Sequence, residues 1–183
     1  MFDCLNNQNA CALSILKDPE FDMVITDPWD NTPLMSAITS GMAQALALLL
    51  NAKSPSMPIR DYINMAKPTG HNAVIYAASI KDVVILKSLL KRGGDPNSRL
   101  SGEKGGWTAM HFAASLGSNF GGHLKMMLEY GGDPYAVTAD GRSILEVCDP
   151  TPVSWRHKVV DILNDAIDAM DEAESAAIGQ AEL

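Results

Sequence analysis

His111 lies in the stretch GGWTAMHFAASLG, which runs from Gly105 to Gly117, and histidine is the side chain best suited to moving a proton near neutral pH. General acid–base catalysis also needs a second group that orients the ring or shares its proton. The neighbours of His111 are small or apolar, and the sequence offers no recognisable partner. We therefore do not predict a catalytic role for this histidine.

Cys148 could act as a nucleophile if His157 or His123 lay beside it, since histidine can activate a thiol. A cysteine-dependent hydrolase is therefore the remote alternative for this chain. The sequence holds no phosphate-binding glycine loop, since GEKGG lacks the lysine-serine ending, and no paired zinc-ligand motif or G-x-S-x-G elbow. We predict no enzymatic activity and no bound cofactor.

Asp18, Glu20 and Asp22 alternate along the chain in a way that could suggest calcium ligands. The glycine turn and the closing glutamate of a helix-loop-helix calcium site are both missing. We therefore predict no metal site.

The composition is that of a globular chain of 183 residues, enough for one domain with a core. No apolar run approaches the length of a membrane span, and Met1 is followed by Asp3 and polar residues instead of a secretory leader. Cys4, Cys11 and Cys148 cannot all pair, which is typical of a reducing compartment. We expect a cytoplasmic protein, or one delivered into the cytoplasm of a host cell.

Most of the net charge of −8 lies at the end of the chain. The acidic residues that follow Lys158, the last basic residue, are Asp161, Asp165, Asp168, Asp171, Glu172, Glu174 and Glu182. Nucleic acids and anionic membranes require a positive face, so we expect neither as a partner. The acidic tail is either a solvated helix face or a docking site for a basic partner.

Related segments recur along the chain. NTPLMSAITSG, HNAVIYAASIK, WTAMHFAASLG and RSILEVCD align on Thr32, Asn72, Thr108 and Ser143, with spacings of 40, 36 and 35 residues. GGDP occurs twice, 38 residues apart, and each copy closes an apolar helical run. Such self-similarity indicates stacked structural repeats.

Each repeat can be read as a pair of helices. The short polar residue at the aligned position can accept a hydrogen bond from the first amides of a helix, and Pro33 suits a first helical turn. Small and apolar residues follow, then a second helix with Val83, Leu86, Leu89 and Leu90 at helical spacing. Neither helix can bury its apolar face alone, so the units are expected to stack.

These motifs resemble the ankyrin repeat, whose consensus contains T-P-L-H-x-A-A and then L-L-x-x-G-A-D-V-N. The resemblance is strongest at GWTAMHFAASLG with MMLEYGGDPY, and it extends along the chain to about Leu163. It implies an all-α solenoid of about four full repeats plus a degenerate N-terminal one. Residues 1–25 would form the degenerate capping repeat, 26–163 the array, and 164–183 an acidic helical extension with a frayed tail. The family's histidine is usually structural, and Thr108 stands where it can hold His111.

Departures from the repeat pattern predict where the fold is altered. KSPSMPIRDY, residues 53–62, is expected to form an enlarged loop. Lys81 replaces the glycine that would end a first helix, which requires a left-handed residue or a different turn. Cys148 maps to a small alanine position, and the inner helix of the fourth unit should be short. An amphipathic helix is expected from Val153 to Glu174, with fraying past Ser175.

The resemblance implies a protein-binding scaffold that uses hairpin tips and the concave side of the inner helices. The family's variable contact positions fall on Trp29, Asn31, Thr39, Ser40, His71, Ser79, Ile80, Lys104, Trp107, Ser115, Leu116 and Arg142. Trp29 and Trp107 either contact a partner or pack over the adjacent hairpin, and His71 is interpreted as an ordinary surface residue. Ile80 and Leu116 either contact a partner or lie against the enlarged loop.

We expect another protein as the partner and a monomer in the unbound state. Since nearly the whole chain is scaffold, we predict that it binds and blocks its partner, as an inhibitor, immunity or host-targeting factor would. An adaptor that recruits partners without inhibiting them is the alternative.

Overall fold

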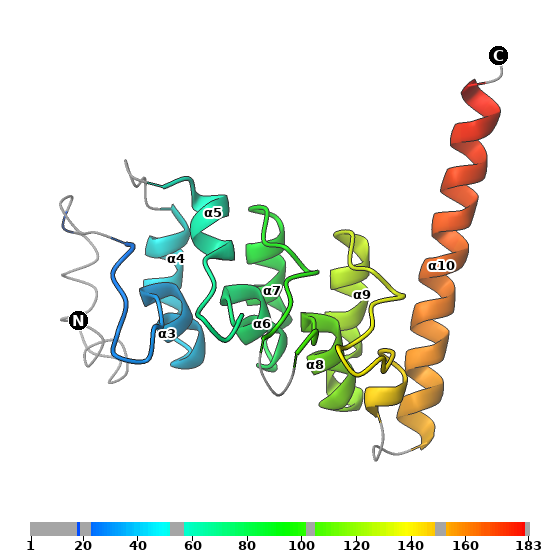
Figure 1. Ribbon diagram of the computed structural model, residues 1–183. Helices are drawn as coiled ribbons and strands as arrows, with labels where there is room; N and C mark the ends of the chain where they lie inside the picture. Colours follow the sequence, from blue (N-terminus) through cyan, green and yellow to red (C-terminus); the bar gives the residue numbers. More distant parts are fainter. Residues whose placement is uncertain (1–17, 19–22, 52–56, 102–104, 149–152, 182–183) are drawn as a thin grey trace.

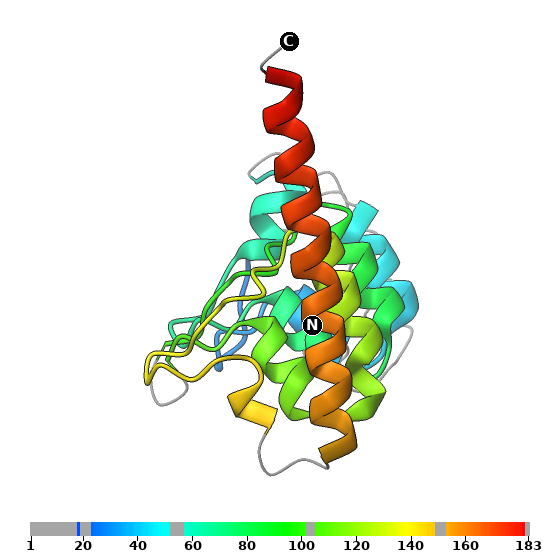
Figure 2. The ribbon, with the colours of Figure 1, turned by 90° about the vertical axis from the view of Figure 1, so that its right-hand side faces the viewer.

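Helix pairs stacked side by side build the protein. The computed structural model describes residues 18, 23–51, 57–101, 105–148 and 153–181, with side chains of the last helix described as far as residue 172. Over these residues it contains no β-strand, and only isolated bridges join Arg99 to Thr108 and Val137 to Ser143. Figure 1 shows the row of helices from the side, and Figure 2 shows it along its length with the hairpin loops projecting to one side. The predicted all-α repeat solenoid is confirmed.

Two rows of helices run through the array. The inner row is α3 (Pro33–Thr39), α6 (Ala73–Ala78) and α8 (Ala109–Ser115), and the outer row is α4 (Ala43–Asn51), α7 (Val83–Leu90) and α9 (Gly121–Glu129). The other helical segments are α5 (Ile59–Asn64), η2 (Ser118–Phe120), η3 (Glu146–Cys148) and α10 (Val153–Ala181). Each inner helix packs on the outer helix of its own unit and on the next inner helix, so the units share one core.

Polar side chains begin the inner helices at the aligned positions. The amide of Met35 donates to Oγ1 of Thr32 over 3.3 Å, and the amide of Ile75 donates to Oδ1 of Asn72 over 3.0 Å. Thr108 holds the same position before α8. These bonds satisfy amides that have no partner within the helix, as the sequence predicted.

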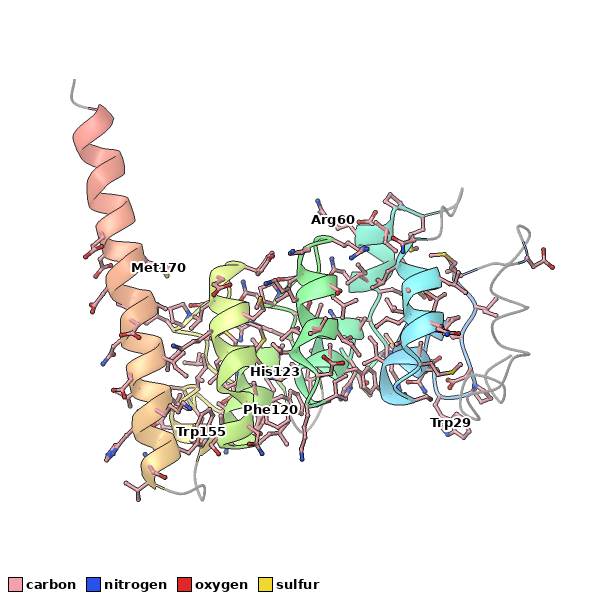
Figure 3. All side chains as sticks on the ribbon, turned by 180° about the vertical axis from the view of Figure 1, so that it is seen from behind. Trp29, Arg60, Phe120, His123, Trp155 and Met170 are labelled. Carbon is pink, nitrogen blue, oxygen red and sulfur yellow. The ribbon has the colours of Figure 1, made fainter. Side chains whose placement is uncertain are left out.

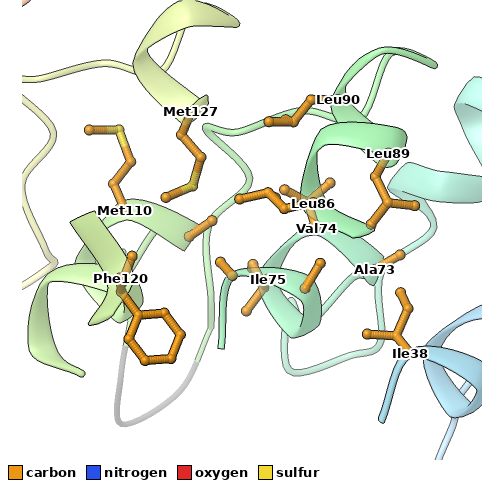
Figure 4. Packing of buried hydrophobic residues seen from close by; sticks show 14 of the residues in the cluster. Ile38, Ala73, Val74, Ile75, Leu86, Leu89, Leu90, Met110, Phe120 and Met127 are labelled. Carbon is orange, nitrogen blue, oxygen red and sulfur yellow. The ribbon is translucent and has the colours of Figure 1, made fainter. Parts of the chain in front are cut away.

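Alanines and larger apolar residues of the inner helices pack with leucines and methionines of the outer helices to make up the core (Figure 4). Ala77 and Ala113 are fully buried, which lets neighbouring inner helices approach closely. Leu86, Leu89 and Met127 on the outer helices are also fully buried. Because every unit buries its apolar face against its neighbours, the array depends on nearest-neighbour contacts for its stability.

Asparagine side chains join the outer loops of successive units. Nδ2 of Asn64 donates to the carbonyl of Gly93 over 2.8 Å, and Oδ1 of Asn64 accepts from the amide of Asp95 over 2.8 Å. Asn97 makes the same pair of bonds to the corresponding loop of the next unit. The side chain therefore acts as a bridge between backbones.

The hairpin loops on the opposite side are also joined to one another. The amide of Ser101 donates to the carbonyl of Thr69 over 2.9 Å, and the amide of Ala139 donates to the carbonyl of Gly105 over 2.8 Å. Gly106 has a φ of +78°, and a Cβ there would lie 2.5 Å from the nitrogen of Ala139. Glycine is required at this contact because the two backbones approach so closely.

The enlarged loop expected over residues 53–62 is wrong in part. Residues 52–56 lie outside the described residues, but Ile59–Asn64 forms helix α5 after Pro58. Tyr62 of α5 is buried, and its hydroxyl accepts from the amide of Leu34 over 3.2 Å. The first unit thus has a short extra helix, and Asn64 at its end makes the bonds that Asn97 makes in the loop after α7.

Lys81 does not take a left-handed conformation, so the turn changes instead. Among the described residues other than glycine, Asp30 is the one with a positive φ, at 61°. Asp82 begins α7, and its Oδ1 accepts from the amide of Val84 over 2.9 Å. Because Asp82 caps the helix, α7 can begin without a glycine at position 81, and Lys81 is accommodated there.

The outer helices are unevenly spaced. α7 packs directly on α9, whereas a groove of about 550 Å³ lies between α4 and α7. Leu46, Leu50 and Ile85 line its apolar part, and Arg92 bridges one end by donating from Nη2 to Oδ1 of Asn51 over 3.2 Å. The first two units are therefore held together chiefly by α3 with α6 and by α5 with α6.

The last unit differs from the others. Its inner helix is reduced to η3, which is short as predicted, and α10 takes the place of its outer helix. Trp155 of α10 is 2 % exposed, and its Nε1 donates to the carbonyl of Ala114 over 2.7 Å. The backbone is helical to Ala181, so α10 extends beyond the expected end at Glu174. Three of the six residues from 176 to 181 are alanine, which favours a helix.

Candidate functional site

His111 has a structural role. It is fully buried, its Nδ1 accepts from the amide of Thr108 over 3.2 Å, and Oγ1 of Thr108 lies 2.9 Å from the same nitrogen. Burial lowers the pKa of the ring from 6.5 to about 4. The backbone of Arg142 and of Ala136 has a smaller effect in the other direction and raises the pKa. The ring is therefore neutral at physiological pH and completes a reciprocal cap at the start of α8.

Cys148 is likewise a core residue. Its thiol is fully buried and donates to the carbonyl of Ile144 over 3.4 Å. Burial raises the pKa of Cys148 to about 11, so the reactive thiolate is scarce at neutral pH. In the described part of the chain no group of His, Cys, Asp and Glu side chains could hold a metal ion. Cys4, Cys11 and the acidic residues 20 and 22 lie outside the described residues.

The first hairpin is organised around Asp27. This carboxylate is 7 % exposed and accepts from the amides of Trp29 (2.9 Å) and Asn31 (2.8 Å) and from Nδ2 of Asn31 (2.9 Å). Burial alone would raise the pKa of Asp27, but these hydrogen bonds and the charge of Lys67 lower it. The carboxylate thereby fixes the loop that carries Trp29, whose side chain is 68 % exposed.

A polar contact connects this hairpin to the second unit. Nζ of Lys67 donates to Oδ1 of Asn31 over 3.0 Å, and the hydroxyl of Tyr76 donates to the same oxygen over 3.2 Å. Lys67 comes from the second hairpin and Tyr76 from α6. Asn31 therefore joins the first hairpin to the second unit.

Aromatic rings continue the line of contacts. The ring centroid of His71 lies 5.6 Å from that of Tyr76 and 6.4 Å from that of Phe112. Phe112 in turn meets Trp107 edge to face at 5.2 Å, a favoured geometry for aromatic pairs. We call Tyr76, His71, Phe112 and Trp107 the aromatic row. It crosses the second and third units between the hairpins and the inner helices.

Arg142 ends the aromatic row at the fourth unit. Its guanidinium lies 6.0 Å from the centroid of the Trp107 ring, and its Nε lies 2.7 Å from Oδ2 of Asp140. Cations favour the face of an indole ring. Asn31, Lys67, the aromatic row and Arg142 thus form one line of contacts that touches all four units.

Several expected contact residues are exposed along this side. Trp29 and Leu116 expose 68 % and 46 % of their surface, and Arg142 is also exposed. Asn31, Ser40 and His71 are half-buried. Lys104 lies outside the described residues.

Trp107 differs from Trp29. Its ring is only 9 % exposed because it packs against Phe112 and beneath Arg142. The interpretation of Trp107 as a residue that packs over its hairpin therefore fits better than that of a contact residue. Ile80 is also half-buried and packs against the core, where it lines the groove between α4 and α7.

The hydroxyl side chains at the ends of the inner helices bond back to their own helices. Oγ1 of Thr39 donates to the carbonyl of Met35, and Oγ of Ser79 and of Ser115 does the same to the carbonyls of Tyr76 and Phe112. These bonds fix the rotamers without tying the side chains to another unit.

Three residues of this surface were missed from the sequence, namely Lys67, Tyr76 and Phe112. Tyr76 and Phe112 hold the same position in consecutive repeats, four residues after the aligned Asn72 and Thr108. An aromatic residue at the same position of two consecutive repeats is a pattern from which these two residues could have been predicted. Lys67 carries no comparable signal, because only the fold brings it to Asn31.

Comparisons with known proteins agree with this architecture. A family model for ankyrin repeats, in three copies, matches residues 1–99. The chain is also similar to the solved structure of an ankyrin repeat domain from Acinetobacter baumannii AYE, with a TM-score of 0.69 and 22 % sequence identity over 88 % of this chain and 76 % of that one. At this identity the likeness shows the fold. A search of curated proteins finds no match.

Within the described residues, every helix is too short or too polar to span a bilayer.

Proposed function

We propose that this chain, which belongs to the ankyrin repeat family, binds a partner protein through its hairpin loops and inner helices and blocks that partner's activity. Ankyrin repeats indicate a protein–protein interaction module. We further propose that the chain has no enzymatic activity of its own. It acts as a monomer in a cytoplasm, either that of its own cell or that of a host cell.

The observation that carries the proposal is the line of contacts from Asn31 to Arg142. The half-buried rings of Tyr76, His71 and Phe112 lie between two cations, Lys67 and Arg142, and Trp29 is exposed at the adjoining hairpin. Large rings and arginine are the side chains that interface hot spots favour. A partner that fits would offer apolar side chains flanked by carboxylates.

Preorganisation favours a blocking role. The hairpins are held to each other by the bonds from Ser101 to Thr69 and from Ala139 to Gly105, and Asp27 fixes the loop of Trp29. A surface that is ordered before binding loses little entropy when it binds, which favours long-lived occupancy of the partner. Long-lived occupancy is what an inhibitor needs.

The test is affinity capture of the partner from native extract, followed by binding and activity measurements on the captured protein. Replacing Trp29 and Arg142 together by alanine should weaken binding by about 2 kcal/mol. Asp61→Ala, an exposed change on α5, is the matched control and should leave affinity unchanged. Unaltered affinity of the double variant would remove these residues from the site.

The partner's activity separates blocking from recruitment. At saturating concentrations of this protein, we expect the activity of the partner to fall. Full activity in the saturated complex would refute the blocking role and favour an adaptor. A second docking site on this chain would support the adaptor alternative.

A further inference from the structure

Helix α10 is much longer than a repeat needs. It has 29 residues, whereas α9 has 9, so it spans about 43 Å at the usual helical rise. Trp155, Val159 and Ile162 near its start are buried against the array. Figure 1 shows the remainder rising past the end of α9, and Figure 3 shows Trp155 near the base of α10 and Met170 where the helix leaves the array.

A groove opens where α10 separates from α9. Its volume is about 370 Å³, and its floor is apolar, with Leu128 from α9 and Ile162, Ala166 and Met170 from α10. Met170 is 52 % exposed, although its position continues the buried stripe of the helix. Alanine at 166 allows another backbone to approach closely. The apolar face of α10 thus continues beyond the surface that the array covers.

Carboxylates border this groove. Asp165 on α10 and Glu129 on α9 line it, with Lys125 as the one basic residue among its lining residues. The rest of α10 after Lys158 carries six acidic residues and no basic one, in a chain whose net charge is −8. A second copy of the chain would bring an equally acidic helix to the groove and be repelled.

We propose that the groove between α9 and α10 is a docking site for a cationic amphipathic helix of a partner protein. The occupant places apolar residues at helical spacing on Leu128, Ile162 and Met170, and its flanking lysines or arginines face Asp165 and Glu129. This is the helix-in-groove mode of recognition, with charge setting the choice of partner. The site is separate from the surface proposed above, so this chain can hold two proteins at once.

A labelled synthetic peptide tests the proposal directly. The probe is a helix-forming peptide of about 18 residues, built from leucine, alanine and lysine with one apolar face. Fluorescence anisotropy follows its binding to the full chain. A scrambled peptide of the same composition keeps the charge but has no apolar face, and a third peptide replaces lysine by glutamate.

We expect the patterned peptide to bind at least about tenfold more tightly than the scrambled one, and the acidic peptide not to bind. Met170→Glu and Asp165→Lys should each weaken binding by about tenfold or more. Met170→Glu adds a negative charge, so simple attraction to the acidic helix would make it bind more tightly, whereas docking on an apolar floor makes it bind less tightly.

Two matched controls lie far from the groove. Val84→Glu introduces the same side chain at an exposed apolar residue of α7, and Asp61→Lys reverses a charge on α5. Both should keep wild-type affinity, and circular dichroism checks that all variants are folded. Equal binding of patterned and scrambled peptides would overturn the proposal. The proposal would also be overturned if sedimentation detected a dimer of this chain that Met170→Glu dissociates, because a second copy would then occupy the groove.

Discussion

Protonation of His111 should destabilise the fold, and the structure gives the size of the effect. The ring is fully buried, and its pKa falls from 6.5 to about 4 on folding. Because the unfolded chain binds the proton more tightly, the contribution of His111 to stability is complete above the unfolded pKa. It is lost progressively as the pH falls from 6.5 toward 4.

Between pH 7 and pH 5 this linkage amounts to about 2 kcal/mol of unfolding free energy. His111→Gln provides the comparison, since a glutamine at this position of a capping box can still accept from the amide of Thr108 but does not titrate in this range. The variant should therefore lose about 2 kcal/mol less than the wild type over the same pH interval.

Urea unfolding at the two pH values measures the difference. His123 is also buried with a lowered pKa, but it is present in both proteins and cancels in the comparison. His157→Gln makes the same substitution at an exposed residue of α10 and is the matched control. Wild type and His111→Gln could lose the same unfolding free energy between pH 7 and pH 5, to within about 0.5 kcal/mol. In that case the buried neutral ring does not cause the loss of stability at low pH.

Other changes test the packing of the array. Trp155→Phe removes the donor to the carbonyl of Ala114 inside the core, and thermal unfolding followed by circular dichroism should show a loss of about 1–3 kcal/mol; an unchanged midpoint would contradict the role of this bond. Gly106→Ala forces a Cβ against the nitrogen of Ala139 at a φ of +78°, so it should destabilise by more than about 1 kcal/mol. Gly131→Ala is the control, because Gly131 has a φ of +84° but its Cβ would meet no neighbouring atom, so the variant carries the backbone strain alone. Equal losses of stability in the two variants would mean that the hairpins are not in close contact.

Local spacing in the sequence was enough to predict the repeat fold. The aligned polar residues recur every 35 to 40 residues and cap the inner helices, buried alanines follow them, and the asparagines at 64 and 97 bond to the next unit. The role of His111 was predictable for the same reason, since Thr108 is three residues away. Features that repeat, or that act within one helical turn, can be read without coordinates.

Contacts between units at non-repeated positions could not be predicted. Lys67 reaches Asn31 across 36 positions of sequence, and no motif marks either residue for the other. The burial of Trp107 depends on Phe112 and Arg142 closing over it from two units. The exposure of a residue on a repeat scaffold is set by its neighbours in space, so a consensus position predicts where a side chain lies but not how much of it is free.

The groove that separates α4 from α7 also affects how the array comes apart. The second and third units share contacts in both rows of helices, whereas the first is joined to the second without close packing of their outer helices. In a linear array, a weak junction divides the chain into segments that open at different free energies. Amide hydrogens of α4 should therefore exchange well before those of α7 and α9, and proteases should release the N-terminal unit first, leaving a shorter but intact stack.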